Sequence, residues 1–334
     1  MTTHQASPAK GRWLAEASEV SVAGDPAALQ VAHLRKTYGS LVAVDDVSFS
    51  VAEGEIFGIL GPNGAGKTTT VECAVGLRSS DSGTIRLMGS DPALDRDRIR
   101  QITGVQLQSG AFPGKLRVGE IIDMYRSFYR HPADVGELTA GLGLADLRRS
   151  YYRSLSGGQQ QRLSVVLALI GAPQIAVLDE MTTGLDPQAR RDAWELIEHV
   201  RDRGTTVLLV THFMDEAERL CDRVALIDSG RVIALDTPAR LAARATGVKT
   251  VRFLPSAPVG DDLLNRLPGV TAIEHDGRHL VVTGTGELAT AVIVALHAAG
   301  IEAQDVRTDA ATLEDAFVRL TGRHLHEADE GARS

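Results

Sequence analysis

The stretch that decides the fold of this chain is GEIFGILGPNGAGKTTT, residues 54–70. Its first half is apolar and bounded by glycines, which is typical of a buried parallel strand. Residues 61–69 then match the pattern G-x-x-x-x-G-K-[ST], and the residues that follow predict a helix. The sequence therefore predicts a strand, a phosphate-binding loop and a helix, with the loop formed by Gly61, Pro62, Asn63, Gly64, Ala65, Gly66, Lys67, Thr68 and Thr69.

The residue types of this loop suit the binding of a nucleotide. Glycines let the backbone curl so that its N–H groups point at phosphate oxygens, and the N-terminus of the helix adds a partial positive charge. Lys67 is expected to reach the β- and γ-phosphates, and the Thr68 hydroxyl to hold Mg²⁺. The alternative is an ordinary glycine-rich turn. The joint presence of the lysine, the hydroxyl and the strand–helix context disfavours it.

Two acidic residues end a second buried strand, IAVLDE, at residues 175–180. Parallel sheets place their sites at the carboxyl edge of the strands. Asp179 is therefore expected near the nucleotide-bound metal ion, acting on it through water. Glu180 points elsewhere and is expected to orient and deprotonate the water that attacks the phosphate. A pair of acids that merely caps the strand end is the alternative, and the nearby phosphate loop makes it less favoured.

Two further residues are candidates on position alone. His212, in VTHFMDEAE (210–218), ends a third buried strand at the same sheet edge and is expected to contact the γ-phosphate. Tyr38, in KTYGS (36–40), precedes the phosphate loop and has the ring needed to stack on a purine base. Position alone favours a core or surface tyrosine instead.

Composition excludes several classes of protein. The 334 residues carry a net charge of -8, and a general nucleic-acid binder needs a basic face instead. The two cysteines, Cys73 and Cys221, fit neither a disulfide scaffold nor a zinc site, and suit a reducing, cytosolic compartment. No apolar run approaches 18 residues, so any membrane span is expected to come from another polypeptide.

The order of predicted elements indicates two domains. Strands alternate with helices up to residue 245, which predicts a covered, largely parallel sheet. Residues 246–325 read β-α-β-β-α-β plus a helix, a small α+β domain with a split-βαβ layout and a hairpin at Asp276-Gly277. Residues 1–27 are expected to be a flexible extension and 326–334 a disordered tail.

A second glycine-containing stretch, LSGGQQQR at residues 155–162, matches the signature of one family. Together with the phosphate loop and the acidic strand, it makes residues 28–245 resemble the nucleotide-binding subunits of ABC transporters. The fold class that this resemblance implies is an α/β P-loop NTPase. It has a RecA-like core, an antiparallel β subdomain and a helical subdomain over about residues 109–160, followed by the small α+β C-terminal domain.

The resemblance explains why the chain has two phosphate-friendly stretches. In the family, two subunits pack head to tail, and the signature of one closes over the ATP that the other holds. The cofactors implied are ATP and Mg²⁺, and the partner implied is a second ATP-binding subunit, expected to be a second copy of this chain. The residues implied to act on the partner's nucleotide are Leu155, Ser156, Gly157, Gly158 and Gln159.

The resemblance also implies roles for single residues. Tyr38 matches the adenine-stacking aromatic and His212 the switch histidine. Asp186, in TTGLDP, matches the loop that crosses the dimer interface. For the glutamine loop, Gln106 and Gln108 share one face of a strand, so alternation does not separate them. The run LRVGE lies at the family's usual distance from Gln108, which is therefore expected to contact Mg²⁺ or the attacking water.

One position departs from the family pattern. The residue after Glu180 is usually proline, and here it is Met181. The change removes no catalytic group, so ATPase activity is expected.

The C-terminal run TLEDAFVRLTGR (312–323) and the stretch DEMTTGLDPQARR (179–191) resemble the daunorubicin-resistance-type ATPases of type 2 exporters. The implied function is ATP-driven export of a hydrophobic drug, a lipid-linked compound or a polysaccharide. The implied place is the cytoplasmic face of a membrane, where the chain would be bound to separate permease subunits, with no nucleic acid partner.

Several other functions fit the sequence less well than export. An importer ATPase remains an alternative. An ATPase of DNA repair or chromosome condensation would need long coiled-coil insertions, and a translation-associated ATPase would normally carry two cassettes. A small-molecule kinase would leave the signature unexplained.

Overall fold

The computed structural model describes residues 27–106, 112–245, 249–309 and 312–322. The chain divides between Pro238 and Ala239 into two compact units, which are treated separately below. Within the described residues, no helix has the length and apolarity needed to cross a bilayer.

The core of the first unit is a six-stranded sheet in the order β5-β6-β7-β3-β8-β9. Neighbouring strands are parallel except β9, which runs antiparallel to β8. Every residue of β3, β6 and β7 is buried, as expected for strands that are covered on both faces. The strands are β3 (Ile56–Leu60), β5 (Thr103–Gln106), β6 (Ile175–Asp179), β7 (Thr206–Thr211), β8 (Arg223–Asp228) and β9 (Arg231–Asp236).

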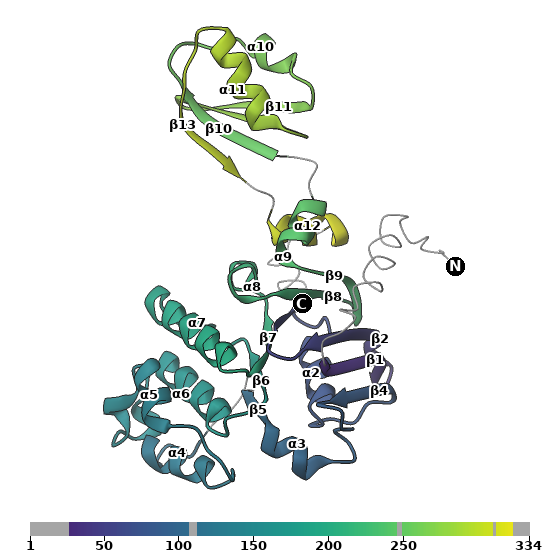
Figure 1. Ribbon diagram of the computed structural model, residues 1–334, viewed down its shortest axis with the longest axis vertical. Helices are drawn as coiled ribbons and strands as arrows, with labels where there is room; N and C mark the ends of the chain where they lie inside the picture. Colours follow the sequence, from purple (N-terminus) through teal and green to yellow (C-terminus); the bar gives the residue numbers. More distant parts are fainter. Residues whose placement is uncertain (1–26, 107–111, 246–248, 310–311, 323–334) are drawn as a thin grey trace. The chain divides into compact units, whose positions relative to one another are not determined.

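An antiparallel sheet in the order β2-β1-β4 lies beside this core (Figure 1). Its apolar side chains share one buried cluster with the central strands and with α2, so that Phe49 stacks on Phe57 with ring centroids 5.3 Å apart. The elements of this part are β1 (Ala27–Tyr38), β2 (Leu41–Ala52), α2 (Lys67–Ala74), β4 (Ser82–Leu87) and α3 (Arg96–Ile102).

Helices α4, α5 and α6 form a group, and α6 packs on β5 (Figure 1). The approach of α6 is close, because a Cβ at Gly104 would meet the Ala168 carbonyl oxygen. The helices are α4 (Val118–Arg126), α5 (Val135–Gly141), α6 (Gly157–Leu169), α7 (Pro187–Asp202) and α8 (Met214–Leu220), with short 3-10 turns η1 (Ala145–Leu147) and η2 (Tyr152–Ser154).

The second unit contains a four-stranded antiparallel sheet in the order β11-β12-β10-β13. The two strands of each βαβ half are separated by a strand of the other half, which is the split-βαβ arrangement that the element order predicts. Helices α10 and α11 bury an apolar core on this sheet around Phe253 and Val282. The elements are α9 (Pro238–Ala245), β10 (Lys249–Pro255), α10 (Asp261–Asn265), β11 (Val270–Asp276), β12 (His279–Gly284), α11 (Leu288–Ala298), β13 (Ala303–Asp309) and α12 (Leu313–Thr321).

Candidate functional site

The phosphate loop and the ends of β1, β6 and β7 meet at one cleft of about 750 Å³. The loop residues that line it are Asn63, Gly64, Gly66, Lys67, Thr68 and Thr69. Three of the other predicted residues, Tyr38, Glu180 and His212, line the same cleft although they are far apart in the sequence. The fold therefore brings together most of the groups predicted to touch the nucleotide.

The loop between β3 and α2 has the conformation that its glycines allow. Gly66 has φ 96°, and a Cβ there would meet the carbonyl oxygen of Ala43, so this position has no room for a side chain. Lys67 is buried, and its Nζ donates hydrogen bonds of 2.7 and 2.9 Å to the carbonyl oxygens of Gly61 and Pro62. The positive charge is thus held at the mouth of the loop by the main chain of the loop itself.

Asp179 ends β6 beside the start of α2. The Thr68 hydroxyl lies 3.2 Å from Asp179 Oδ2, and the Asp179 N–H donates to Gln106 Oε1 at 3.0 Å. Burial, helped by the negative charge of Glu180, raises the pKa of Asp179 to about 6, against the lowering effects of Thr68 and Lys67. The carboxylate is therefore held in a place where a nearby cation would favour its ionised form.

Glu180 has an unusual backbone. Its φ is 50°, the left-handed region that costs a residue with a Cβ on the order of 1–3 kcal/mol. Hydrogen bonds hold it on both sides. The Glu180 N–H donates to the Val210 carbonyl at 2.8 Å, and the Glu180 carbonyl accepts from Thr183 N–H at 3.2 Å and from Gln161 Nε2 at 3.1 Å.

The Glu180 side chain faces a histidine. His212 Nδ1 lies 3.2 Å from Glu180 Oε1, and both side chains are mostly buried. His212 also packs on the ring of Phe213, with centroids 4.1 Å apart. With the proton on Nδ1, the imidazole donates to the carboxylate and limits its orientation.

Tyr38 ends β1 with 37% of its surface exposed. The Arg78 guanidinium lies 5.3 Å and the Lys36 ammonium 5.7 Å from the centroid of its ring. Each cation has an acidic partner, because Arg78 pairs with Glu72 and Lys36 with Asp81. The Tyr38 ring therefore lies at the cleft beside two cations, and each cation is held by its own acidic partner.

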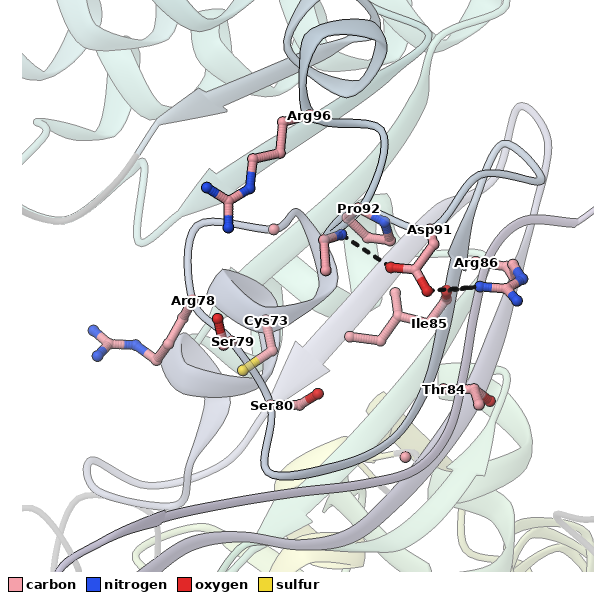
Figure 2. A pocket seen from close by; sticks show the side chains of 13 residues that line it. Cys73, Arg78, Ser79, Ser80, Thr84, Ile85, Arg86, Asp91, Pro92 and Arg96 are labelled. Carbon is pink, nitrogen blue, oxygen red and sulfur yellow. Dashed lines mark hydrogen bonds and ion pairs between the residues drawn. The ribbon is translucent and has the colours of Figure 1, made fainter.

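A second, smaller hollow of about 200 Å³ lies between the end of α2 and the loop before α3 (Figure 2). Its acidic side chain, Asp91, is already bonded to Arg86 Nη1 at 2.9 Å and to the Ala93 N–H at 3.0 Å. The catalytic candidates Glu180 and His212 line the larger cleft, so that cleft is the better site for a nucleotide.

The signature stretch begins α6. The Ser156 hydroxyl accepts from Gln159 N–H at 3.2 Å, while Gln159 Oε1 accepts from Ser156 N–H at 2.9 Å, forming a capping box. Ser156 and Gly157 are exposed and Leu155 is buried. The signature residues do not contribute to the lining of the nucleotide cleft of their own chain.

Asp186 lies at the start of α7, where its Oδ1 accepts hydrogen bonds from Gln188 N–H at 3.0 Å and Ala189 N–H at 2.9 Å. These backbone donors, with Ala189 the larger contributor, hold the pKa of Asp186 below its usual range. Asp186 is therefore a helix cap in this structure and, like the signature, is not part of the cleft lining.

Comparison with known proteins identifies the family. The family model described as ABC transporter matches residues 44–183. Nod factor export ATP-binding protein I of Ralstonia nicotianae is 36% identical over 318 residues, which cover 91% of this chain and 97% of that protein. Daunorubicin resistance ATP-binding protein DrrA3 of Streptomyces coeruleorubidus is 37% identical over 312 residues, covering 90% and 98%. The chain belongs to the family of ABC transporter ATP-binding subunits.

Solved structures agree with this assignment of the ABC ATPase. One described as the ATP-binding subunit of an ABC transporter is 28% identical, with a TM-score of 0.60, covering 65% of this chain and 92% of that chain. An ATP-binding cassette solved as a dimer with ADP and phosphate bound is 25% identical, with a TM-score of 0.57, covering 63% and 98%. The α/β P-loop fold and ATP as the cofactor are thereby confirmed.

The oxygen atoms of the ABC ATPase's cleft fit a magnesium ion. Thr68 Oγ1 and Asp179 Oδ2 are adjacent, and Mg²⁺ prefers oxygen ligands. No group of three or more acidic, histidine or cysteine side chains that could hold a metal ion occurs among the described residues. Magnesium is usually bound by one or two carboxylates together with substrate phosphates and water, so Thr68 and Asp179 are the residues that would hold it.

The structure describes one of the two candidates for the glutamine loop of the ABC ATPase. Gln108 lies outside the described residues. Gln106 is the last residue of β5, and its amide oxygen supports the backbone of Asp179. Sequence reasoning missed the contact between Gln161 and Glu180, and also missed Thr183, which lines the cleft. No local pattern signals the contact of Gln161, because it depends on where β6 and α6 meet.

Proposed function

We propose that this chain is the ATP-hydrolysing subunit of an ABC exporter and that two copies sandwich ATP between them. The observation that carries the proposal is the position of Glu180 and His212, 3.2 Å apart at the cleft formed by the phosphate loop. The proposed cargo is a hydrophobic drug, a lipid-linked compound or a polysaccharide.

The chemistry proposed for the cleft is attack of water on the γ-phosphorus. The Glu180 carboxylate takes a proton from the water. The oxygen of the water forms a bond to the γ-phosphorus while the bond from that phosphorus to the ADP oxygen breaks. Lys67 exchanges its two backbone carbonyls for phosphate oxygens, and Tyr38 stacks on the adenine. Thr68 and Asp179 would hold a magnesium ion, Asp179 through water, and the ion would supply charge neutralisation. Gln108 is proposed to contact this ion or the attacking water.

The exposed N-terminus of α6 supports the need for a second copy. Ser156 and Gly157 are accessible and do not line the cleft of their own chain, so they are available for a nucleotide held elsewhere. Backbone N–H groups at a helix N-terminus suit a phosphate anion. Head-to-tail packing would bring this end of α6 to the γ-phosphate bound by the partner.

The relatives named for Nod factor export and daunorubicin resistance support export as the direction of transport. We propose that separate integral-membrane permease subunits bind the helical subdomain and hold the chain at the cytoplasmic face of a membrane. The cargo would then be chosen by the permease.

The first experiment is light scattering on the purified chain with and without ATP. Glu180→Gln with ATP is expected to hold two cassettes together, because hydrolysis no longer releases them. Glu53→Gln, which changes an exposed glutamate, is the matched control and is expected to behave as the wild type. Cassettes that stay apart in Glu180→Gln with ATP would contradict the sandwich.

The chain co-purified with its permease in mild detergent tests the direction of transport. Mass identification of the co-purified proteins is expected to find one kind of polytopic subunit and no extracytoplasmic binding protein. Recovery of a binding protein with the permease would favour import, whereas recovery of nucleic acid or ribosomes in place of a permease would contradict transport.

A further inference from the structure

Gln161 lies on the helix that the signature begins, and it contacts the catalytic loop of the same chain. Its Nε2 donates a 3.1 Å hydrogen bond to the carbonyl oxygen of Glu180. The adjacent Gln160 instead bonds to the Leu155 carbonyl, next to its own helix. Only one of these two glutamines therefore joins α6 to the end of β6.

The acceptor of this bond belongs to the most strained residue of the cleft. Glu180 has φ 50°, and the residue after it is Met181, which leaves the backbone free of the restriction that proline would impose. What holds the Glu180 peptide groups is hydrogen bonding. Val210 accepts from the N–H, and Thr183 N–H and Gln161 share the carbonyl. Removing the Gln161 donor would leave the Thr183 N–H bonded to that carbonyl.

We propose that Gln161 is a positioning residue that couples the signature helix of each subunit to the catalytic glutamate of that same subunit. This inference rests on the proposed ATP sandwich. When the N-terminus of α6 binds the partner's nucleotide, the helix becomes fixed, and through Gln161 it fixes the backbone that aims the Glu180 carboxylate at its own nucleotide. Each site would therefore hydrolyse ATP efficiently only when the other is occupied.

The continuity of α6 makes this coupling direct. The capping box joins Ser156 to Gln159, and Gln161 follows within the next turn of the same hydrogen-bonded helix. The segment between anion-binding end and catalytic loop is thus rigid secondary structure, with no loop in which a displacement would be absorbed.

The test compares three variants in steady-state ATPase assays of the full complex. Gln161→Met keeps the length of the side chain and removes the donor. It is expected to lower kcat by about three- to tenfold, the range for one net hydrogen bond. The KM for ATP should stay within about twofold, because Gln161 does not line the cleft. Gln161→Lys restores a donor and is expected to recover most of kcat.

Gln160→Met is the matched control, one residue away on the same helix, and is expected to keep kcat within about twofold of the wild type. The Hill coefficient for ATP should fall towards 1 in Gln161→Met and remain at the wild-type value in the control. A merely structural glutamine would lower the melting temperature and would not separate kcat and cooperativity from KM.

Two results would overturn the inference. One is wild-type kcat and cooperativity in Gln161→Met, and the other is an equal loss in Gln160→Met. Failure of the proposed function would look different, because wild-type ATPase activity would then show no cooperativity in ATP at all. In that case the coupling between subunits is refuted, and the kcat of Gln161→Met reports only positioning within one chain.

Discussion

Asp179→Asn is expected to make the nucleotide-free protein more stable while removing its ability to use magnesium and ATP. Asp179 is 1% exposed and has Glu180 as its neighbour, so its ionised form is costly in the fold. Asparagine has nearly the same shape, can still accept from the Thr68 hydroxyl, and carries no charge. The variant thus isolates the cost of one buried carboxylate.

The size of the effect follows from the pKa of Asp179, which rises from 3.8 to about 6. A shift of about two units at 1.36 kcal/mol per unit corresponds to about 3 kcal/mol. A raised carboxyl pKa means that the folded state binds the proton more tightly. This group therefore costs stability above pH 6, costs less as pH falls, and costs nothing below about pH 4.

The assay is thermal unfolding of the nucleotide-free, magnesium-free chain at pH 7.5 and pH 5. At pH 7.5 Asp179→Asn is expected to melt several degrees above the wild type, since each kcal/mol moves the midpoint by roughly 2 to 4 °C in a domain of this size. At pH 5 the gain is expected to fall to about half. Asp146→Asn, at an exposed aspartate, is the control and should leave the midpoint unchanged.

Adding MgATP should reverse the order, because the wild type gains stability from the ligand and Asp179→Asn does not. If the nucleotide-free variant melts below the wild type at both pH values, Asp179 is stabilised by its surroundings and the reasoning is wrong. A gain that is the same at pH 5 and pH 7.5 would equally refute it, since the cost must follow the titration of the carboxyl group.

Three further predictions concern other parts of the first unit. Tyr38→Ala is expected to weaken ATP binding by about 1–3 kcal/mol in calorimetry, whereas Tyr38→Phe keeps the stacking ring and should change it little; equal losses would exclude stacking. Ser156→Ala is expected to lower the free energy of unfolding by about 1 kcal/mol in urea titrations, because the capping box at α6 is lost; an unchanged midpoint would mean that the cap is unimportant. Glu216 is fully buried, with its pKa raised mainly by burial, and accepts from Trp194 Nε1 at 3.2 Å. Glu216→Gln should therefore preserve stability at pH 7, while Glu216→Ala should cost about 2–4 kcal/mol in the same titrations; equal effects would contradict this.

Residues whose roles follow from a local pattern could be predicted from the sequence. The phosphate loop needs a strand, glycines and a helix in succession, and the chain has them between Ile56 and Ala74. The split-βαβ order of the second unit follows in the same way from the succession of its elements. Glu180 and His212 could be placed at one sheet edge because parallel strands end on the same side.

Contacts between side chains from distant elements could not be predicted. Alternation put Gln106 and Gln108 on one face of a strand, and only packing against β6 gives the Gln106 amide a contact with the Asp179 backbone. The left-handed backbone of Glu180 and its bond from Gln161 depend on the crossing of α6 and β6, for which sequence spacing gives no signal. Of the two cations beside the Tyr38 ring, Lys36 lies two residues away on β1, whereas Arg78 comes from the loop after α2 and meets the ring only in the fold.

The two hydrogen bonds from Lys67 close the phosphate loop on itself, because they tie its first two residues, Gly61 and Pro62, to the first residue of α2. The side chain that carries the charge is therefore also a brace across the loop. Replacing Lys67 by a neutral residue would loosen the loop as well as remove a positive charge. A loss of ATP binding in such a variant would thus combine a change in loop order with a change in electrostatics, and cannot be assigned to charge alone.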